Sequence, residues 1–480
     1  MKTLVAGFLL LAATLARAEA IGYEGARHLL NRAGFGATDS EINALAGLSR
    51  VDAADRLLDE ARREATLAPP AFVDEPFTPY YRVRQMSAEE RMAATRVIFQ
   101  QGLELRAWWL REMLATPSPL TERMTLFWHG HFATGLQKVR SNPLMYRQNV
   151  LLRREALGNF GTLLHDIARD PAMLVYLDNA GSRREAPNEN FAREVMELFT
   201  LGEGRYGERD VKEAARAFTG WSLDRDSGEY MYRRAWHDAG EKTVLGKTGR
   251  FDGTQVLDIL LERPDTARLV VGKLWREFVS PTPDAAIVAV WAGEFMKSRY
   301  EVKPLMKALL TSDAFWAPEN RASLIKSPVD MVVGTLRTFA IRPMDMRPAA
   351  FACAALGQNP MSPPNVKGWP GGEAWINSAT LLRRRQWVER VFRATDPMPP
   401  APLLETPASG PNEMRRSLER GMAGYGFESE RWSRTLSPGA AQARIEKLVL
   451  AMPPVRSLPA DEEDASRLRA LVADPAYQLR

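Results

Sequence analysis

Apolar residues recur at intervals of three and four along most of this sequence, which is the spacing of helices that bury one face. Leu120, Met124 and Phe127 show the pattern, and Ser118-Pro119 just before them is a typical helix start. Alternation of the kind found in strands is confined to one short stretch. The sequence therefore predicts a mainly α protein: a large irregular helical domain with a small β-hairpin insertion near residues 221–246.

Capping residues indicate where individual helices begin and end. Thr38 followed by Glu41 forms a capping box, in which each side chain bonds to the other residue's backbone N–H. Asn188 is expected to cap a helix that runs through Leu201, and Gly202 is its stop signal.

The first twenty residues have the layout of a signal peptide. Lys2 gives the positive start, residues 4–15 are apolar, and small residues around Ala18 and Ala20 offer cleavage sites. A membrane span needs about 20 apolar residues, and this run ends earlier, at Arg17. We therefore expect cleavage, a periplasmic or secreted mature protein, and no transmembrane anchor.

Charge and cysteine content exclude several classes of protein. The chain has 64 basic and 59 acidic residues, and loss of Lys2 and Arg17 with the signal peptide lowers the net charge from +5 to +3. A protein that binds nucleic acid usually presents a concentrated basic face, whereas this chain is nearly neutral, so no nucleic acid partner is expected. The single cysteine, Cys353, rules out an intramolecular disulfide.

Composition divides the mature chain into three parts. We predict a signal peptide over 1–20, a helical domain over 21–396, a Pro-rich linker over 397–411 and a polar helical tail over 412–480.

Four segments combine polar or ionisable side chains with aromatic or apolar ones, and any chemistry is expected there. They are residues 127–132, 188–198, 236–242 and 363–370. Common enzyme motifs are missing from the sequence: it has no phosphate-binding Gly-x-x-x-x-Gly-Lys loop, no Gly-x-Ser-x-Gly elbow and no His-Glu-x-x-His helix.

The second segment places two carboxylates along the edge of the core. On a helix, Asn190, Glu194 and Glu197 form a stripe beside an apolar face. Carboxylates there are costly unless they are paired, hydrogen-bonded or bound to metal. Two interpretations remain open: Glu194 and Glu197 serve a divalent metal site, or they pair with arginines in a structural network.

The His129-x-His131 pair is also open to two interpretations. On a regular helix the two side chains lie about 200° apart, so one metal ion could not bind both. On an extended segment they would share a face, and Gly130 makes an early helix end plausible.

The sequence resembles the bacterial family called domain of unknown function 1800, from His28 to about Arg384. The motifs that carry the resemblance are His28 to Gly36, Phe127 to Phe132, Asp170 to Leu174, Asn188 to Thr200, Ala214 to Trp221, His237-Asp238 with Lys242, and Pro363 to Trp369. The resemblance implies an exported, largely helical protein. It also suggests a partner, because members of the family are often encoded beside an exported sulfatase- or phosphatase-like protein. It implies no reaction. It fades after Pro397, so the tail is expected to be peripheral.

Two functions follow as hypotheses. The first is an exported, metal-assisted, hydrolytic enzyme acting on an extracytoplasmic substrate, whose residues His129, Glu194 and His237 would approach within about 10 Å. The roles expected for its residues are metal binding by His129, His131, His237 and Asp238, catalysis by Glu194, Glu197 and Lys242, and substrate binding by Asn190, Lys367 and Trp369. The second is a non-catalytic exported binding protein that partners the sulfatase- or phosphatase-like protein.

Overall fold

The computed structural model describes residues 19–393, 421–438, 442–456 and 464–480. Helices dominate it and strands are few, which confirms the predicted fold class. The predicted linker over 397–411 and all but the last two residues of the predicted signal peptide lie outside the described residues.

The first half of the chain is almost entirely helical. Its elements are α1 (Gly22–Ala33), α2 (Asp39–Ala46), α3 (Arg50–Asp59), η1 (Ala71–Asp74), α4 (Tyr80–Gln85), α5 (Ala88–Ala115), α6 (Pro119–His131), α7 (Leu136–Val139), α8 (Asn142–Arg154), α9 (Phe160–Arg169), α10 (Pro171–Tyr176), η2 (Asn179–Gly181), α11 (Glu189–Glu194), η3 (Val195–Leu201) and α12 (Glu208–Ala217).

The second half contains the strands and the remaining helices. These are β1 (Trp221–Leu223), β2 (Tyr230–Tyr232), η4 (Arg234–Trp236), β3 (Lys242–Val244), β4 (Lys247–Gly249), α13 (Gly253–Leu261), α14 (Pro264–Phe278), α15 (Ala285–Lys297), α16 (Val302–Thr311), α17 (Asp313–Trp316), η5 (Pro318–Asn320), α18 (Pro328–Thr338), α19 (Arg347–Ala355), η6 (Gly372–Trp375), α20 (Ser378–Arg393), η7 (Met422–Tyr425), α22 (Ser429–Ser433), α23 (Gln442–Val449), α24 (Asp464–Ala473) and η8 (Pro475–Gln478).

The predicted helix boundaries are found in the structure. Thr38 and Glu41 exchange both bonds of the capping box, and Asn188 accepts the first backbone N–H groups of α11. Gly202 ends the segment at φ +88°, which glycine adopts without steric cost. The last part of this segment, η3, is a π-helix, which the sequence did not predict.

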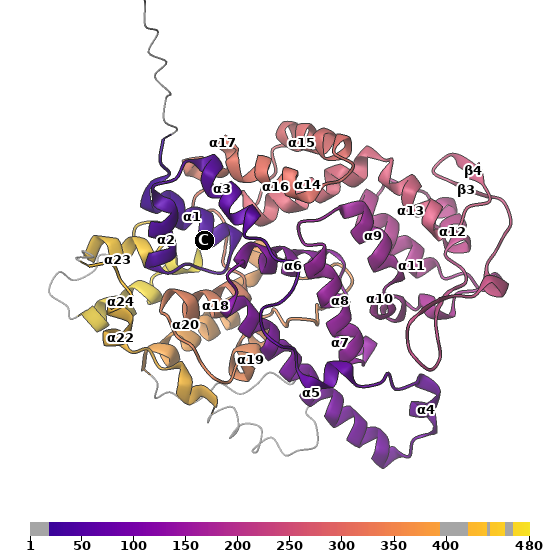
Figure 1. Cartoon of the computed structure of the whole chain (residues 1–480), viewed down its shortest axis with the longest axis horizontal. Helices are drawn as coiled ribbons and strands as arrows, with labels where there is room; N and C mark the ends of the chain where they lie inside the picture. Colours follow the sequence, from indigo (N-terminus) through magenta and orange to yellow (C-terminus); the bar gives the residue numbers. More distant parts are fainter. Residues whose placement is uncertain (1–18, 394–420, 439–441, 457–463) are drawn as a thin grey trace, which may run out of the picture.

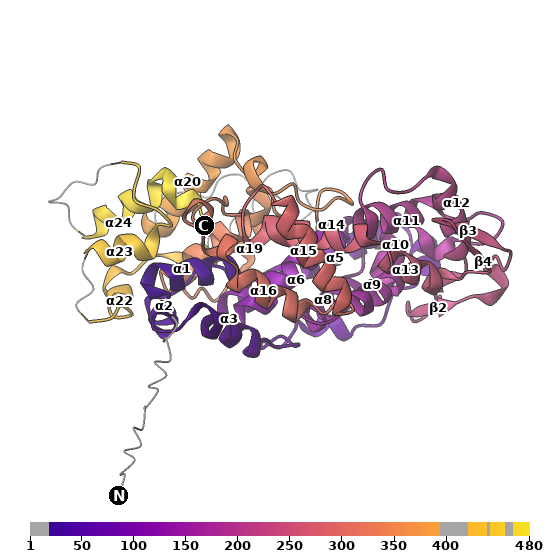
Figure 2. The same ribbon diagram turned by 90° about the horizontal axis from the view of Figure 1, so that it is seen from above.

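Two antiparallel hairpins, rather than the single one predicted, interrupt the helices. β1 pairs with β2 inside the predicted region, whereas β3 and β4 form a second hairpin that extends to Gly249. Both figures of the whole chain place β3 and β4 at one end of an elongated molecule and α6 near its middle (Figures 1 and 2).

The centre of the core is an aromatic cluster around the end of α6. Phe132 stacks on Phe160 with ring centroids 6.1 Å apart and meets Phe199 edge-on at 5.1 Å. Trp128, buried beside them, donates its indole N–H to the carbonyl of Ala156. This packing fixes the position of the histidines on the same helix.

The described end of the tail is built into the fold, so the expectation of a wholly peripheral tail is wrong there. Tyr477 and Arg480 are buried, and Ile325 forms a β-bridge with Leu479. The yellow helices α22–α24 lie beside the indigo helices α1 and α2 in Figures 1 and 2. Arg27 of α1 donates to two carbonyl groups at the end of α23.

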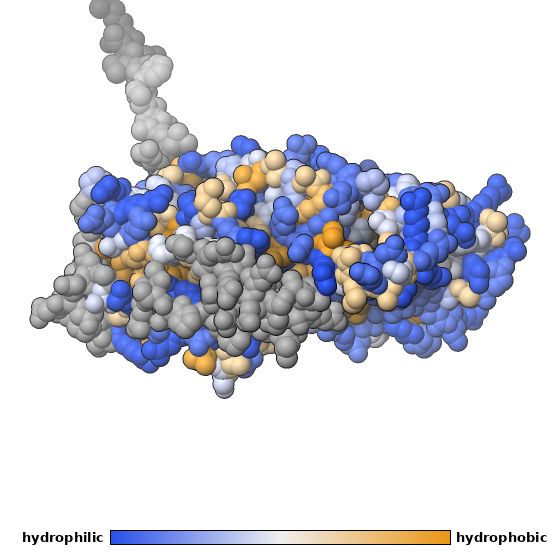
Figure 3. All heavy atoms as spheres, turned by 90° about the horizontal axis from the view of Figure 1, so that it is seen from below, coloured by the Kyte–Doolittle hydropathy of each residue, from blue (hydrophilic) through white to orange (hydrophobic). Residues whose placement is uncertain are grey.

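The face seen in Figure 3 is mainly hydrophilic, with apolar side chains interspersed near its middle. No helix in the described part of the chain combines the length and the apolar character that a membrane crossing requires.

Candidate functional site

The two histidines of α6 point in different directions. Because the helix continues to His131, the extended alternative is not adopted, and the pair cannot chelate one metal ion. His129 lies between the rings of Trp109 and Trp369, each 5.6 Å away between centroids. Neither of its ring nitrogens has a hydrogen-bond partner among the described residues, and burial lowers its pKa to about 4. His129 is therefore a neutral imidazole.

His131 is held by two neighbours that fix its tautomer. Its Nε2 lies 3.1 Å from the carbonyl oxygen of Phe199, which can only accept, so the ring proton is on Nε2. Its Nδ1 then accepts a hydrogen bond from Nζ of Lys273, at 3.0 Å. Burial holds the pKa of His131 well below its usual value, and the charge of Lys273 acts in the same direction.

Lys273 is the ionisable residue that sequence reasoning missed. It lies on α14 within the apolar run Val270 to Trp275, and Nζ also donates to the carbonyl of Leu198 at 3.0 Å. Burial, with a smaller contribution from the charge of Arg276, lowers its pKa to about 8. Lys273 and His131 thus cap the last carbonyls of the π-helix η3. An isolated lysine in an apolar pattern gives no sequence signal for this role.

The two glutamates of residues 188–198 take no part in the hydrogen bonds that hold His131. Glu197 accepts a hydrogen bond from the hydroxyl of Tyr206. Glu194 is half-buried, and its carboxylate forms no hydrogen bond or ion pair within the described ranges. Burial and the charge of Glu197 raise its pKa, although Lys367 opposes them, so Glu194 lies within electrostatic reach of Lys367. Asn190 is exposed.

The third segment forms a separate cluster with α12. Asp238 binds the guanidinium of Arg216 at 2.7 and 3.1 Å, which is the main reason that its pKa is lowered. His237 places Nδ1 3.0 Å from the carbonyl oxygen of Thr219. Lys242 is buried and donates to the backbone carbonyls of Asp238 and Gly240. These contacts hold the segment between η4 and β3 in place.

The structure therefore does not assemble the predicted metal pocket. Within the described residues, no group of three or more His, Cys, Asp or Glu side chains is arranged to hold a metal ion. His129 and His131 diverge, and His237, Asp238 and Lys242 are engaged beside α12. Metal binding by any of these residues remains a prediction.

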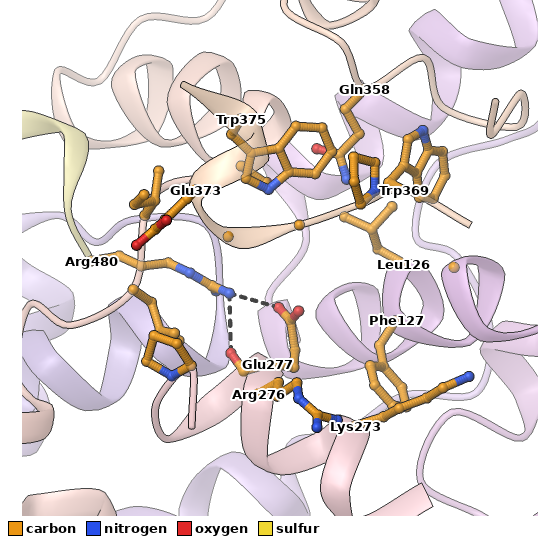
Figure 4. A pocket seen from close by; sticks show the side chains of 18 of the residues that line it. Leu126, Phe127, Lys273, Arg276, Glu277, Gln358, Trp369, Glu373, Trp375 and Arg480 are labelled. Carbon is orange, nitrogen blue, oxygen red and sulfur yellow. Dashed lines mark hydrogen bonds and ion pairs between the residues drawn. The ribbon is translucent and has the colours of Figure 1, made fainter. Parts of the chain in front are cut away.

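Instead, a cleft of about 590 Å³ opens between α6, α14 and the loop that follows α19. Of the predicted residues, His131, Lys367 and Trp369 line it. Figure 4 shows Trp369 and Trp375 on one side and Lys273 and Arg276 of α14 on the other. The residues of the cleft are Arg123, Leu126, Phe127, Gly130, His131, Lys273, Arg276, Glu277, Pro281, Ser323, Leu324, Ile325, Ser327, Gln358, Lys367, Trp369, Pro370, Gly371, Gly372, Glu373, Trp375 and Arg480.

A backbone contact positions the tryptophan loop against α6. Gly368 has φ +80°, and a Cβ atom there would lie 2.3 Å from the carbonyl oxygen of Gly130. Only glycine allows this approach. The loop then lays Trp369 across His129 and leaves Trp369 as a wall of the cleft. The sequence pointed to both Gly130 and this loop without predicting their contact.

The floor of the cleft is a buried ion-pair network. Arg123 and Arg480 share the carboxylates of Glu277 and Asp330. Although burial disfavours ionisation of Asp330, the two arginines hold its pKa well below the usual range. These four charges neutralise one another, so the remaining charges decide which ligand the cleft attracts.

The comparisons with known proteins identify a family. The chain matches the family described as "Protein of unknown function (DUF1800)" over residues 28–479. It belongs to this family. The DUF1800 match confirms the predicted resemblance and extends it beyond Arg384 to residue 479. No curated protein and no solved structure matches the chain.

Proposed function

We propose that this chain is an exported binding protein that takes an anionic ligand into the cleft between α6 and α14. The observation that carries the proposal is the charge of the cleft. Lys273, Arg276 and Lys367 line it, and within the described residues none of them forms an ion pair with a carboxylate. Among the described residues that line the cleft, Glu373 is the only acidic one outside the ion-pair network.

Donor groups add to this attraction. Lys273 uses two of its three N–H groups on His131 and Leu198, which leaves the third for a ligand. Nη1 of Arg480 is buried without a hydrogen-bond partner in the described part of the chain. Figure 4 also shows the indole nitrogen of Trp375 turned toward the cleft. Acceptor oxygens of a ligand would satisfy all three groups.

The partner implied by the family resemblance fits the same chemistry. A sulfatase- or phosphatase-like protein handles anionic substrates and releases an inorganic anion, and a neighbouring binding protein could hold either. The metal-assisted enzyme is the weaker proposal because its ligand residues are not brought together. Elemental analysis of untagged protein after dialysis against divalent metals tests it: stoichiometric retention of a metal would favour the enzyme.

The export proposal has a separate test. N-terminal sequencing of protein recovered from outside the cytoplasm should find a mature chain that begins at Glu19 or Ile21. An intact Met1 on protein from that compartment would contradict cleavage.

Titration calorimetry of the full chain with sulfate, phosphate and small organic sulfonates and carboxylates tests the anion-binding function. We expect at least one of these anions to bind, and to bind more weakly as salt screens the charges. Lys367→Gln and Arg276→Gln should each weaken that binding about tenfold, which is about 1.4 kcal/mol.

Lys297→Gln is the matched control, because Lys297 is an exposed lysine on α15 already paired with Glu294. Equal weakening by the control, or no anion binding by the wild type at low salt, would overturn the proposed function.

A further inference from the structure

The cleft has two chemically different sides. In Figure 4 the indoles of Trp369 and Trp375 form its upper wall, and the basic side chains of Lys273 and Arg276 face it from α14 below. We propose that the ligand is an acidic saccharide, with a sugar ring against the indoles and its acidic group against α14. This inference rests on the proposed function and names the class of its ligand.

The platform is formed mainly by the half-buried indole of Trp369, and the indole of Trp375, which is only 6% exposed, completes the wall beside it. The two indoles come from the same loop, and both line the cleft. His129 and the Gly130–Gly368 contact support Trp369 from behind. The C–H face of a sugar ring packs on one side of such a surface.

Polar groups of both kinds surround this platform. Glu373 offers carboxylate oxygens that accept, whereas Arg480 and the indole of Trp375 offer N–H groups that donate. Gln358 uses its carbonyl oxygen on the backbone N–H of Val329, which leaves its amide N–H groups for the cleft. Sugar hydroxyls both donate and accept, so a saccharide can satisfy such a mixed set.

The acidic group is recognised on the opposite side. Lys273 and Arg276 are three residues apart on α14 and therefore lie on one face of the helix. Two adjacent cations suit a carboxylate or sulfate ester better than a neutral sugar. A volume of about 590 Å³ exceeds what a lone inorganic anion fills and lies in the usual range for small organic ligands.

The experiment compares four probes on the full chain by calorimetry and tryptophan fluorescence. They are a galacturonic acid trisaccharide and a sulfated disaccharide, a neutral disaccharide, and benzenesulfonate. We expect at least one acidic saccharide to bind ten times more tightly than both the neutral disaccharide and benzenesulfonate. Trp375→Phe and Trp369→Phe should weaken saccharide binding at least fivefold. Trp291→Phe is the control, because Trp291 of α15 packs on Trp275 of α14 and is not among the residues that line the cleft.

The outcomes separate the inference from the proposed function. If benzenesulfonate binds best, the saccharide inference is overturned and only anion binding remains. If the neutral disaccharide binds equally well, the inference is also overturned, because the cleft would then bind sugars without selecting an acidic group. If both tryptophan variants bind the saccharide as tightly as the wild type, the sugar ring does not pack on these indoles and that part of the inference is overturned. If neither these probes nor inorganic anions bind, both proposals fall together.

Discussion

The ionisation of a buried or half-buried glutamate depends on the residues that it contacts, as Glu122 and Glu194 show. Glu122 on α6 is buried and binds Arg153 through both carboxylate oxygens, while it also accepts from the indole of Trp109. Glu194 on α11 is half-buried and has no such partner in the described part of the chain, and its pKa is raised mainly by burial. Both lie on helices at the edge of apolar stripes, so the spacing that predicts burial cannot predict pairing.

Glu194→Gln should therefore be tolerated. The change removes a charge that burial disfavours and keeps the side-chain volume, so we expect the melting temperature at pH 7 to stay within about 2 °C or to rise. The positive control is Glu122→Gln, which leaves Arg153 unpaired and should cost about 3–5 kcal/mol. Scanning calorimetry with and without divalent metal measures both. A large loss in Glu194→Gln without metal would instead indicate a structural network around Glu194.

Asp170 gives a prediction about pH. It is the N-cap of α10 and accepts from Gln148 and from the backbone N–H of Met173. Burial raises its pKa to about 7, although these hydrogen bonds oppose the shift. The folded state therefore holds a proton that the unfolded state releases near pH 4, so this group's contribution to stability falls as pH rises from about 4 to 7.

Asp170→Asn keeps the capping oxygen and cannot ionise, so it should gain stability relative to the wild type as pH rises from 5 to 8. We expect the difference in melting temperature to shift by roughly 5 °C or more across this range. Asp284→Asn is the control, an exposed N-cap of α15. A difference that does not change with pH would mean that Asp170 is ionised throughout.

At the scale of elements, the sequence predicts well where helices lie along the chain, but it predicts poorly which helices contact one another. Local signals set the ends of α2, α6 and α11, because a cap acts within one turn. The π-helix η3 was not predictable, because the carbonyl of Leu198 is capped by Lys273, which lies 75 residues further along the chain. For the same reason the sequence held no indication of the basic side of the cleft. Lys367 and Trp369, which line the cleft, were predicted as substrate-binding residues from the local polarity of their loop, and that role stays a prediction.

The loop that carries Trp369 depends on one backbone approach, which Gly368→Ala should break. The added Cβ would meet the carbonyl oxygen of Gly130 at 2.3 Å, so the loop must move and Trp369 with it. We expect ligand binding to fall at least tenfold while most of the stability remains. Gly246→Ala is a matched control, because Gly246 has φ +84° in the turn between β3 and β4, is not among the residues that line the cleft, and has no atom within 4 Å of the new Cβ. Equal effects of both variants would assign the loss to backbone strain and not to the contact.

On the scale of the whole molecule, the two ends of the chain are joined. Arg444 of α23 binds Asp39 of α2, and Lys447 binds Glu24 of α1. A boundary near residue 396 was drawn from composition, which reports local polarity and carries no information about such long-range pairs. The family match through residue 479 agrees with the packing of the C-terminal segment, not with a separate tail.

Arg480 shows how much the C-terminal segment contributes to the fold. Its guanidinium is buried and binds the side chain and the carbonyl of Glu277 at 2.8 and 3.1 Å (Figure 4). It also lies 3.4 Å from Asp330. In Arg480→Ala, Arg123 alone would have to compensate the buried carboxylate of Asp330 and the partly buried carboxylate of Glu277. Removing one member of a buried ionic network typically costs about 3–5 kcal/mol, because the remaining charge is left without compensation.

We therefore expect urea denaturation of Arg480→Ala to show a loss of that size, and anion binding to weaken because the floor of the cleft reorganises. Arg434→Ala removes an exposed arginine paired with Glu430 and should change stability by less than about 1 kcal/mol. If the two variants lose stability equally, the ion pairs of Arg480 contribute little and the apolar contacts of Tyr477 hold the segment. If stability falls while anion binding is retained, Arg480 supports the fold without shaping the cleft.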